Sequence, residues 1–143
     1  MNESAAPSSL TPDLQASLLC DDVRQERNGK FILIGIFDGL AVPQLPARVP
    51  RICVVHRWCF GQGAFVEHTR LVAPDGRTVV VEGKDVQVRL PDGNHTATSI
   101  EVFMNVPFEQ PGAYWIEVLL EGQLRLRYPL IVRRIEPAPQ PGA

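Results

Sequence analysis

Apolar and polar residues alternate in two neighbouring stretches near the end of the chain. The even-numbered positions of residues 114–120 are all apolar, and so are those of residues 124–132. Alternate side chains of a strand point to opposite faces, so the pattern predicts two strands that each bury one face. The short polar segment Glu121-Gly122-Gln123 lies between them and predicts a β-hairpin.

The alternation also predicts how these two strands pair. Directly opposed residues share a face, so even positions must oppose even positions, which requires a loop with an odd number of residues. A three-residue loop opposes Val118 to Leu126 and, on the other face, Glu117 to Arg127, a favourable charge pair. Pro129 cannot donate a ladder hydrogen bond, which indicates that the last strand lies at a sheet edge or carries a bulge.

A second hairpin is predicted earlier in the chain. Residues 51–60 and 64–73 are largely apolar, and Gly61-Gln62-Gly63 separates them. A three-residue loop here opposes Arg57 to Glu67, a second cross-strand charge match. The same register opposes each even position of one strand to an even position of the other.

Three further stretches predict strands. Residues 31–37 form a continuous apolar run, which is typical of a strand buried on both faces, and Gly35 within it indicates a bulge or a close neighbour. Residues 14–23 fit either a helical turn or a strand, and we prefer the strand. Residues 98–108 alternate well.

The chain as a whole reads as about eight short strands with a turn signal every ~8–12 residues, which favours a single antiparallel β-sandwich of immunoglobulin-like type. A β-barrel is the alternative. The 13 prolines and 11 glycines fit many turns. The domain is expected to span residues 13–135, between a flexible N-terminal tail at 1–12 and a Pro-rich tail at 136–143.

Composition excludes several classes of function. A net charge of −2 gives no general attraction to nucleic acid or to an anionic membrane. No apolar run approaches the ~18 residues of a transmembrane helix, and residues 1–15 lack the basic start and apolar stretch of a secretory signal. Three cysteines cannot all pair within one chain. We therefore expect a cytoplasmic protein with reduced thiols.

One metal-binding hypothesis arises from the second hairpin, whose register opposes His56 to His68 and Cys53 to Leu71. Facing imidazoles could both bind zinc, which needs one or two further ligands. Cys53 and Cys59 point to the other face of the strand, so they do not complete the set. The alternatives are therefore a metal-binding protein or metal-dependent enzyme, and two hydrogen-bonded histidines on a sheet. No cofactor is predicted.

Nucleophilic catalysis has little support in the sequence. Ser17 and Ser99 have no recognisable base partner. Cys20 is followed by two aspartates, whose negative charge disfavours a reactive thiolate. Cys53 and Cys59 are too far apart along one strand to form a disulfide, so we expect them to pack. The remaining acids are scattered over turns, where a calcium site would need several of them to converge.

An interaction surface is predicted on the outer face of the last hairpin, where the residues concerned are Trp115, Leu119, Arg125 and Arg127. Exposed aromatic and arginine side chains are frequent interface anchors. The alternative is a solvated strand face whose charges discourage edge pairing. The preferred function is therefore a non-catalytic protein-interaction or assembly module, with a protein partner or self-association. A small ligand inside the sandwich is not excluded.

Two resemblances bear on the fold and on the family. The segment Pro111-Gly112-Ala113-Tyr114 resembles the corner before the penultimate strand of immunoglobulin-like domains, which implies that the Tyr114 hydroxyl bonds to nearby backbone. The segments 20–26, 28–31 and 33–37, opening Cys-Asp-Asp-Val-Arg, resemble a family of short bacterial proteins of unknown function, as does the later Leu120-Glu121-Gly122 turn. That resemblance covers residues 14–133, implies a bacterial cytoplasmic domain, and transfers no catalytic residues.

Overall fold

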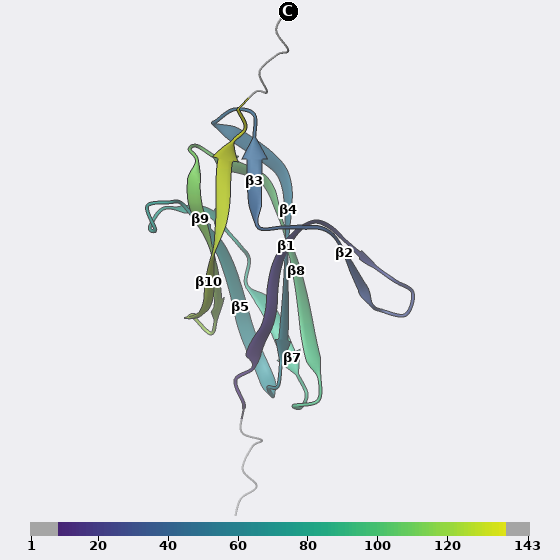
Figure 1. Cartoon of the computed structure of the whole chain (residues 1–143). Helices are drawn as coiled ribbons and strands as arrows, with labels where there is room; N and C mark the ends of the chain where they lie inside the picture. The colour runs from purple at the N-terminus through teal and green to yellow at the C-terminus, as the bar shows by residue number, and fades with distance from the viewer. Residues whose placement is uncertain (1–8, 137–143) are drawn as a thin grey trace, which may run out of the picture.

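Ten β-strands and no helix make up the computed structural model, which describes residues 9–136 (Figure 1). The strands are β1 (Asp13–Gln25), β2 (Phe31–Phe37), β3 (Gly39–Val42), β4 (Ala47–Cys59), β5 (Gly63–Val72), β6 (Val79–Glu82), β7 (Val86–Leu90), β8 (Thr96–Phe108), β9 (Gly112–Leu120) and β10 (Gln123–Arg134). The all-β expectation is confirmed. The number of strands in the described residues is ten rather than about eight.

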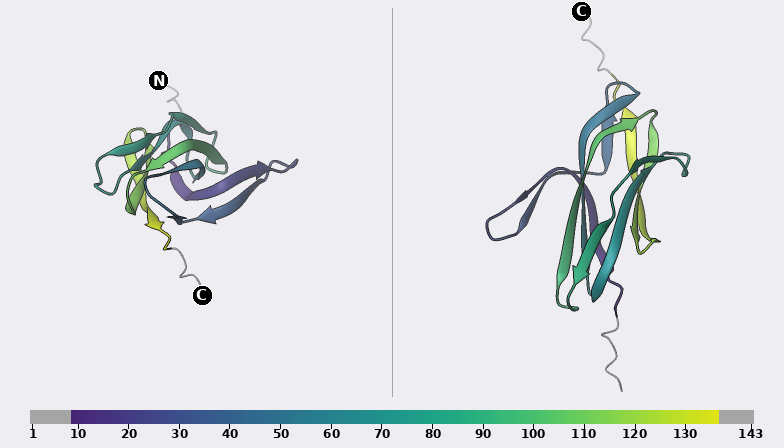
Figure 2. Two further views of the ribbon diagram at one scale, coloured as in Figure 1. Left: turned by 90° about the horizontal axis from the view of Figure 1, so that it is seen from above. Right: turned by 180° about the vertical axis from the view of Figure 1, so that it is seen from behind.

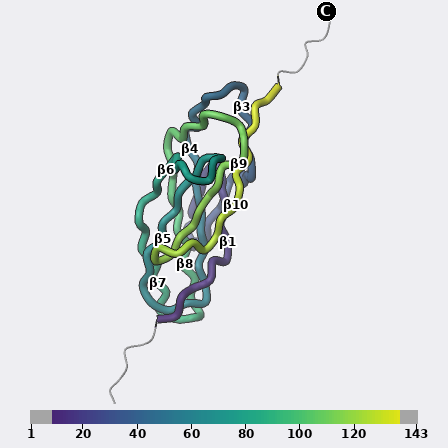
Figure 3. The backbone as a smooth tube through the Cα atoms, turned by 90° about the vertical axis from the view of Figure 1, so that its left-hand side faces the viewer, coloured from purple at the N-terminus to yellow at the C-terminus, as the bar shows by residue number. Residues whose placement is uncertain are grey.

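The strands form two sheets rather than a barrel. One sheet has four strands in the order β2-β1-β4-β8. The other has six, in the order β3-β10-β9-β5-β6, with β7 also paired to β5. The views in Figures 2 and 3 show the two layers and the ends of the described chain at opposite ends of the molecule. One pairing departs from the expected antiparallel arrangement, because β3 runs parallel to β10.

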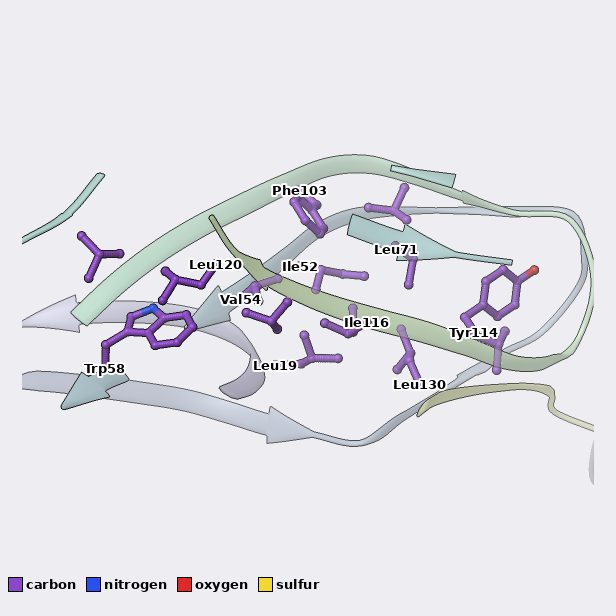
Figure 4. Packing of buried hydrophobic residues seen from close by; sticks show 14 of the residues in the cluster. Leu19, Ile52, Val54, Trp58, Leu71, Phe103, Tyr114, Ile116, Leu120 and Leu130 are labelled. Carbon is purple, nitrogen blue, oxygen red and sulfur yellow. The ribbon is translucent and has the colours of Figure 1, made fainter. Parts of the chain in front are cut away.

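The core lies between the two sheets and is built from alternate positions of the long strands. From the four-stranded sheet, Ile52, Val54 and Trp58 point inward, and from the six-stranded sheet Leu71 and Ile116 face them (Figure 4). All five side chains are fully buried. Burying a large apolar side chain contributes about 1.5–3 kcal/mol relative to leaving it exposed, so this layer is the main stabilising feature of the fold.

The closing hairpin forms as β9 and β10, with one difference in its turn. Val118 opposes Leu126 and Glu117 opposes Arg127, as expected. The turn, however, has two residues, and Gln123 opposes Leu120. A bulge between Leu124 and Leu126 then restores the even-to-even pairing. The bulge supplies the extra residue that the sequence argument assigned to the loop.

The expected hairpin between residues 51–60 and 64–73 does not form. The two segments are β4 and β5, which belong to different sheets and face one another across the core. Both edges of β4 are occupied, by β1 and β8. The predicted oppositions of Arg57 to Glu67 and of Cys53 to Leu71 are therefore wrong. Even-numbered side chains of β4 and odd-numbered side chains of β5 point inward and meet between the sheets, as in the hydrogen bonds of Trp58 with Glu67 and of His56 with Thr69.

Two strands bury different faces from those expected. Residues 31–37 are not buried on both faces, because β2 is the edge strand of its sheet and alternates between half-buried and exposed positions. In β8, the regular alternation changes at Asn105, which has a φ of 51°. As a result Met104 points outward while Val106 joins the core.

Two local expectations are confirmed. The Tyr114 hydroxyl donates to the carbonyl of Gln110 at 2.7 Å, as the Pro-Gly-x-Tyr segment implied. Pro129 pairs with Trp115 in the ladder, while β3 pairs with β10 only from Ile131 onward. Pro129 therefore lies where β10 is a sheet edge, and its missing donor costs no ladder hydrogen bond.

Candidate functional site

One end of the four-stranded sheet projects from the body of the sandwich as an arm. The end of β1 and the whole of β2, residues 21–37, turn away from the sandwich and stand beside it (Figures 1 and 2). We call this segment the arm. Three alternating isoleucines on it, Ile32, Ile34 and Ile36, are 43%, 43% and 57% exposed. Such a row of large apolar side chains in water is unusual for a monomer.

Local chemistry explains how the arm turns back on itself and leaves the body. Asn28 and Gly29 make its tip, where the Asn28 side chain accepts from the Lys30 backbone N–H at 2.9 Å and Gly29 has a φ of 92°. At its base Gly35 has a φ of 70°, and a β-carbon there would collide with Asp21. The close neighbour that the sequence indicated at Gly35 is therefore the Asp21 side chain.

An ion-pair network ties the base of the arm to the body. Asp22 accepts from Arg24 at 3.2 Å and from Arg51 of β4 at 2.6 Å. The hydrogen bond from Arg24, with one from the Val23 backbone, lowers the pKa of Asp22. The two arginines are exposed and Asp22 is partly exposed, so we expect each ion pair to be weak.

Two hollows separate the arm from the outer face of the four-stranded sheet. The larger, of about 530 Å³, has Phe31 and Leu33 of the arm on one side and Leu18 and Val55 of the body on the other. The smaller, of about 240 Å³, is lined by arm residues together with Cys53 of β4 and residues of β8. Several apolar side chains of this outer face are partly exposed: Leu18, Ile100, Val102 and Met104.

A buried polar layer lies between the sheets. Glu67 of β5 is 1% exposed, and its carboxylate accepts from Trp58 Nε1 at 2.7 Å and from Ser99 Oγ at 2.6 Å. His56 Nε2 shares a hydrogen bond of 2.8 Å with Thr69 Oγ1. Ser99, for which the sequence showed no recognisable base partner, donates to a buried acid, and Trp58 donates to the same carboxylate.

The structure does not bring the two candidate metal ligands together. His56 points into the core, whereas His68 lies on the outer face of the six-stranded sheet, where its ring nitrogens contact Glu82 and Asp85. The register that opposed them is wrong, since His68 is paired with Leu119. Within residues 9–136, no three His, Cys, Asp or Glu side chains gather in a way that could hold a metal ion.

The pKa values of the two histidines are shifted in opposite directions. Burial lowers the pKa of His56, although the nearby Glu67 carboxylate acts in the opposite direction. The hydrogen bond to Glu82 raises the pKa of His68, and Asp85 adds to the effect against partial burial. Burial thus disfavours the charged form of His56, whereas the two carboxylates favour the charged form of His68.

The predicted interface residues are found on and around the outer face of the six-stranded sheet. Trp115 and Leu119 are half-buried, whereas Arg125 and Arg127 are exposed. The Arg127 guanidinium stacks on the Trp115 ring at 4.0 Å and reaches Glu117 at 3.3 Å. Arg125 lies at the bulge of β10 and donates a hydrogen bond to the Gln123 side chain. An intramolecular network thus engages much of this face.

The arm was not predicted, because a continuous apolar run is also typical of a strand inside a sheet. Two signals could have distinguished an edge strand from an inner strand. The run has a charge at each end, Lys30 before it and Asp38 after it, and an Asn-Gly turn precedes it. An Asn-Gly turn indicates that the run is the second strand of a hairpin, and the second strand of a terminal hairpin commonly forms a sheet edge.

Comparison with known proteins places this two-sheet, all-β chain in a family. The chain belongs to DUF6941, a family of unknown function, whose model matches residues 15–133. No curated protein matched the chain. Among solved structures, the Pseudomonas fluorescens alkylpurine DNA glycosylase AlkC bound to DNA containing an abasic site analog aligns with a TM-score of 0.46 and 14% identity. That alignment covers 67% of this chain and 28% of the glycosylase chain.

The part of the chain that the structure describes contains no helix of the length and apolarity needed to cross a bilayer.

The predicted tails lie mostly outside the described residues, but Leu10 is described and forms a β-bridge with Gln62.

Proposed function

We propose that this protein is a non-catalytic assembly module that self-associates by pairing β2 with β2 of a second copy. One observation carries the proposal: β2 is an uncharged, apolar edge strand on a projecting arm. The residues that sequence reasoning examined for catalysis have structural partners instead, since Ser99 donates to Glu67 and Ser17 bonds to Tyr128.

The free edge of β2 lacks the usual protection against pairing. Edge strands in monomers are commonly blunted by charged residues, by proline or by a covering loop. Residues 31–37 contain neither a charge nor a proline. In the described sheet β2 has β1 as its single neighbour. An edge of this kind is a template for another strand, and a second copy supplies one of identical length.

The β2 sequence is self-complementary in an antiparallel register centred on Ile34. In that register Ile34 opposes Ile34 of the second copy, and Ile32 opposes Ile36. The exposed isoleucines of both copies then meet on the same face, where cross-strand apolar pairs stabilise a sheet. The resulting contact is isologous, as two-fold symmetric dimers require.

The charges that flank β2 favour the same register. Lys30 of one copy opposes Asp38 of the other at each end of the seam, and both side chains are exposed in the single chain. Opposite charges directly across a strand pair contribute roughly 0.2–1 kcal/mol, and like charges oppose pairing. A parallel arrangement would instead place Lys30 beside Lys30.

The size of the seam sets the expected affinity. Seven residues of strand span about 23 Å, so an interface limited to β2 lies below the ~1,200 Å² of total buried area that stable complexes usually reach. We therefore expect a reversible dimer whose population depends on protein concentration.

We also infer that the sandwich is immunoglobulin-like, on the support of the hydrogen bond from Tyr114 to the Gln110 carbonyl. The bacterial source and cytoplasmic location implied by the family resemblance stay predictions. Purification of the native protein from fractionated host cells would test both.

Sedimentation velocity over a range of protein concentrations tests the dimer. The wild-type chain should move from about 15.9 kDa towards twice that mass as concentration rises. Ile34→Lys places two like charges at the two-fold axis and should give a monomer at all concentrations. Val79→Lys is the matched control, because Val79 is a 39% exposed residue on the edge strand β6 and should leave the dimer intact.

A charge-reversal cycle tests the register. Lys30→Asp and Asp38→Lys should each weaken the dimer, because each brings like charges together at both ends of the seam. The double variant should restore it. A wild-type chain that stays monomeric throughout the series would overturn the proposal, and a dimer indifferent to both single reversals would overturn the register.

A further inference from the structure

Two of the three cysteines face each other across neighbouring strands. Cys20 of β1 is directly opposed to Cys53 of β4 in an antiparallel ladder. Neither thiol is exposed, and both belong to one small cluster on the outer face of the four-stranded sheet. The Cys53 thiol donates weakly to the backbone carbonyl of Asp21, 3.6 Å away. The sequence did not show this pairing, because the two residues are far apart along the chain.

Directly opposed positions of an antiparallel ladder suit a disulfide. Their α-carbons are about 4.5 or 5.5 Å apart, depending on the hydrogen-bonding phase, and disulfides span roughly 4.4–6.8 Å between α-carbons. Their β-carbons are about 4.5–5.5 Å apart, so closing the bond needs a shift of about 1 Å at most to reach the usual β-carbon separation.

We propose that Cys20 and Cys53 form a reversible dithiol–disulfide pair that exchanges with small disulfides such as glutathione disulfide. One protein thiolate attacks the oxidant, forms a mixed disulfide and releases one glutathione thiol. The second protein thiolate then displaces the other glutathione and closes the protein disulfide. The two cysteines lose two protons and two electrons in total, and one glutathione disulfide becomes two glutathione thiols.

The surroundings of the two sulfurs differ and suggest an order of events. Cys53 and Arg51 line the smaller hollow beneath the arm, whereas Cys20 lines neither hollow. Burial raises the pKa of the Cys20 thiol, and Cys53 and Asp21 add to the effect. A small disulfide that enters the smaller hollow therefore meets Cys53 before it meets Cys20. We therefore assign the first attack to Cys53 and the second to Cys20.

The arm controls access to the pair. Val23 and Leu33 of the arm pack against the two cysteines, and Cys53 lines the smaller hollow beneath the arm. A buried thiol reacts only when its cover opens, and segments with few buried contacts open at low free energy. Oxidation should therefore proceed through arm opening, and the closed disulfide should fasten β1 to β4 at the base of the arm.

Thiol counting and mass spectrometry on the folded, full-length chain test the proposal. Incubation of reduced protein with glutathione disulfide should remove two free thiols per chain and give a peptide pair linked through Cys20 and Cys53. Cys59 is partly exposed and provides the internal comparison. It should acquire a glutathione adduct without a partner, and Cys59→Ser should still lose two thiols.

Variants of the pair separate reactivity from folding. Cys20→Ala should stop at a glutathione adduct on Cys53, with unchanged circular dichroism. Asp22→Asn removes the ion pair at the base of the arm and should speed oxidation of the pair between about 1.5- and fivefold. If Cys59 is modified while Cys20 and Cys53 stay reduced in both the wild type and Asp22→Asn, the proposal is overturned. A linked peptide that contains Cys59 would overturn it as well.

Discussion

The ionisable residues on the two sides of the six-stranded sheet have different kinds of partner. On the inner side Glu67 is fully buried and accepts from Trp58 and Ser99, and His56 lies nearby with Nδ1 unpartnered. On the outer side His68 lies between Glu82 and Asp85. Polar groups in a core are tolerated when they are hydrogen-bonded, so the inner layer links the two sheets through defined contacts.

The two histidines should give pH dependences of opposite sign. The pKa of His68 is raised by Glu82, so its stabilising effect is complete below its ordinary pKa of about 6.5 and is lost as pH rises through the raised value. The pKa of His56 is lowered by burial, so the folded state loses stability as pH falls from about 6.5 towards that lowered value.

Urea denaturation between pH 5.5 and 8.5 separates the two effects. His68→Gln should cost most stability at the acid end of this range and least at the alkaline end. The variant should also show a steeper loss of stability on acidification than the wild type, because the His56 effect is then no longer offset. An equal loss for His68→Gln at every pH would contradict the assigned role.

At the scale of elements, the closing hairpin shows how far alternation can be used. The pattern predicted β9, β10 and the oppositions of Val118 and Glu117 correctly. It could not place the extra residue, because an odd loop and a two-residue turn followed by a bulge give the same parity. The structure has the turn at Glu121 and Gly122, with φ values of 51° and 76°, which suits the right-handed twist of the hairpin.

A glycine comparison tests this turn. Gly122→Ala should destabilise the protein by about 1 kcal/mol, because a β-carbon disfavours the left-handed region. Nothing lies within 4 Å of the added methyl, so the effect is conformational alone. Gly93→Ala is the matched control: its added methyl is equally free of contacts and its φ is not in that region, so the change should stay within about 0.5 kcal/mol. Equal effects in thermal denaturation would contradict the two-residue turn.

The predicted pairing of β4 with β5 is wrong for a physical reason. Side chains that point inward from two facing sheets have the same polarity pattern as side chains that share a face of one sheet. The charge match of Arg57 with Glu67 therefore carried no information, since Glu67 is in the core and Arg57 faces outward, where it bonds to Thr98. Deciding between the two arrangements needs the neighbours of β4, which come from distant parts of the chain.

At the scale of the whole molecule, the class of fold follows from local patterns but the topology does not. Strand propensity and turns predicted an all-β chain with two layers. The order of strands depends on pairings between remote segments, such as β3 with β10 and β4 with β8. The candidate sites depend on the same pairings, because the free edge of β2 and the opposition of Cys20 to Cys53 exist only once β1 lies between β2 and β4.

This topology should make the protein a slow folder. The long strands β4 and β8 pair only after the chain between them has been brought into place, and β3 pairs with the last strand of the chain. Loop-closure entropy must be overcome before these contacts form, and all-β domains dominated by such pairings fold in milliseconds to seconds. Trp58 is fully buried in the core and reports when the two sheets pack.

Stopped-flow fluorescence of the Ile34→Lys variant measures this step without interference from self-association. We expect its main refolding phase within that range of milliseconds to seconds. Replacement of Ile52 by Val, in the centre of the four-stranded sheet, should cost about 0.5–1.5 kcal/mol. If the two sheets pack in the rate-limiting step, part of this loss should appear as slower folding rather than as faster unfolding alone. Refolding in microseconds would mean that local contacts, not the remote strand pairings, limit the rate.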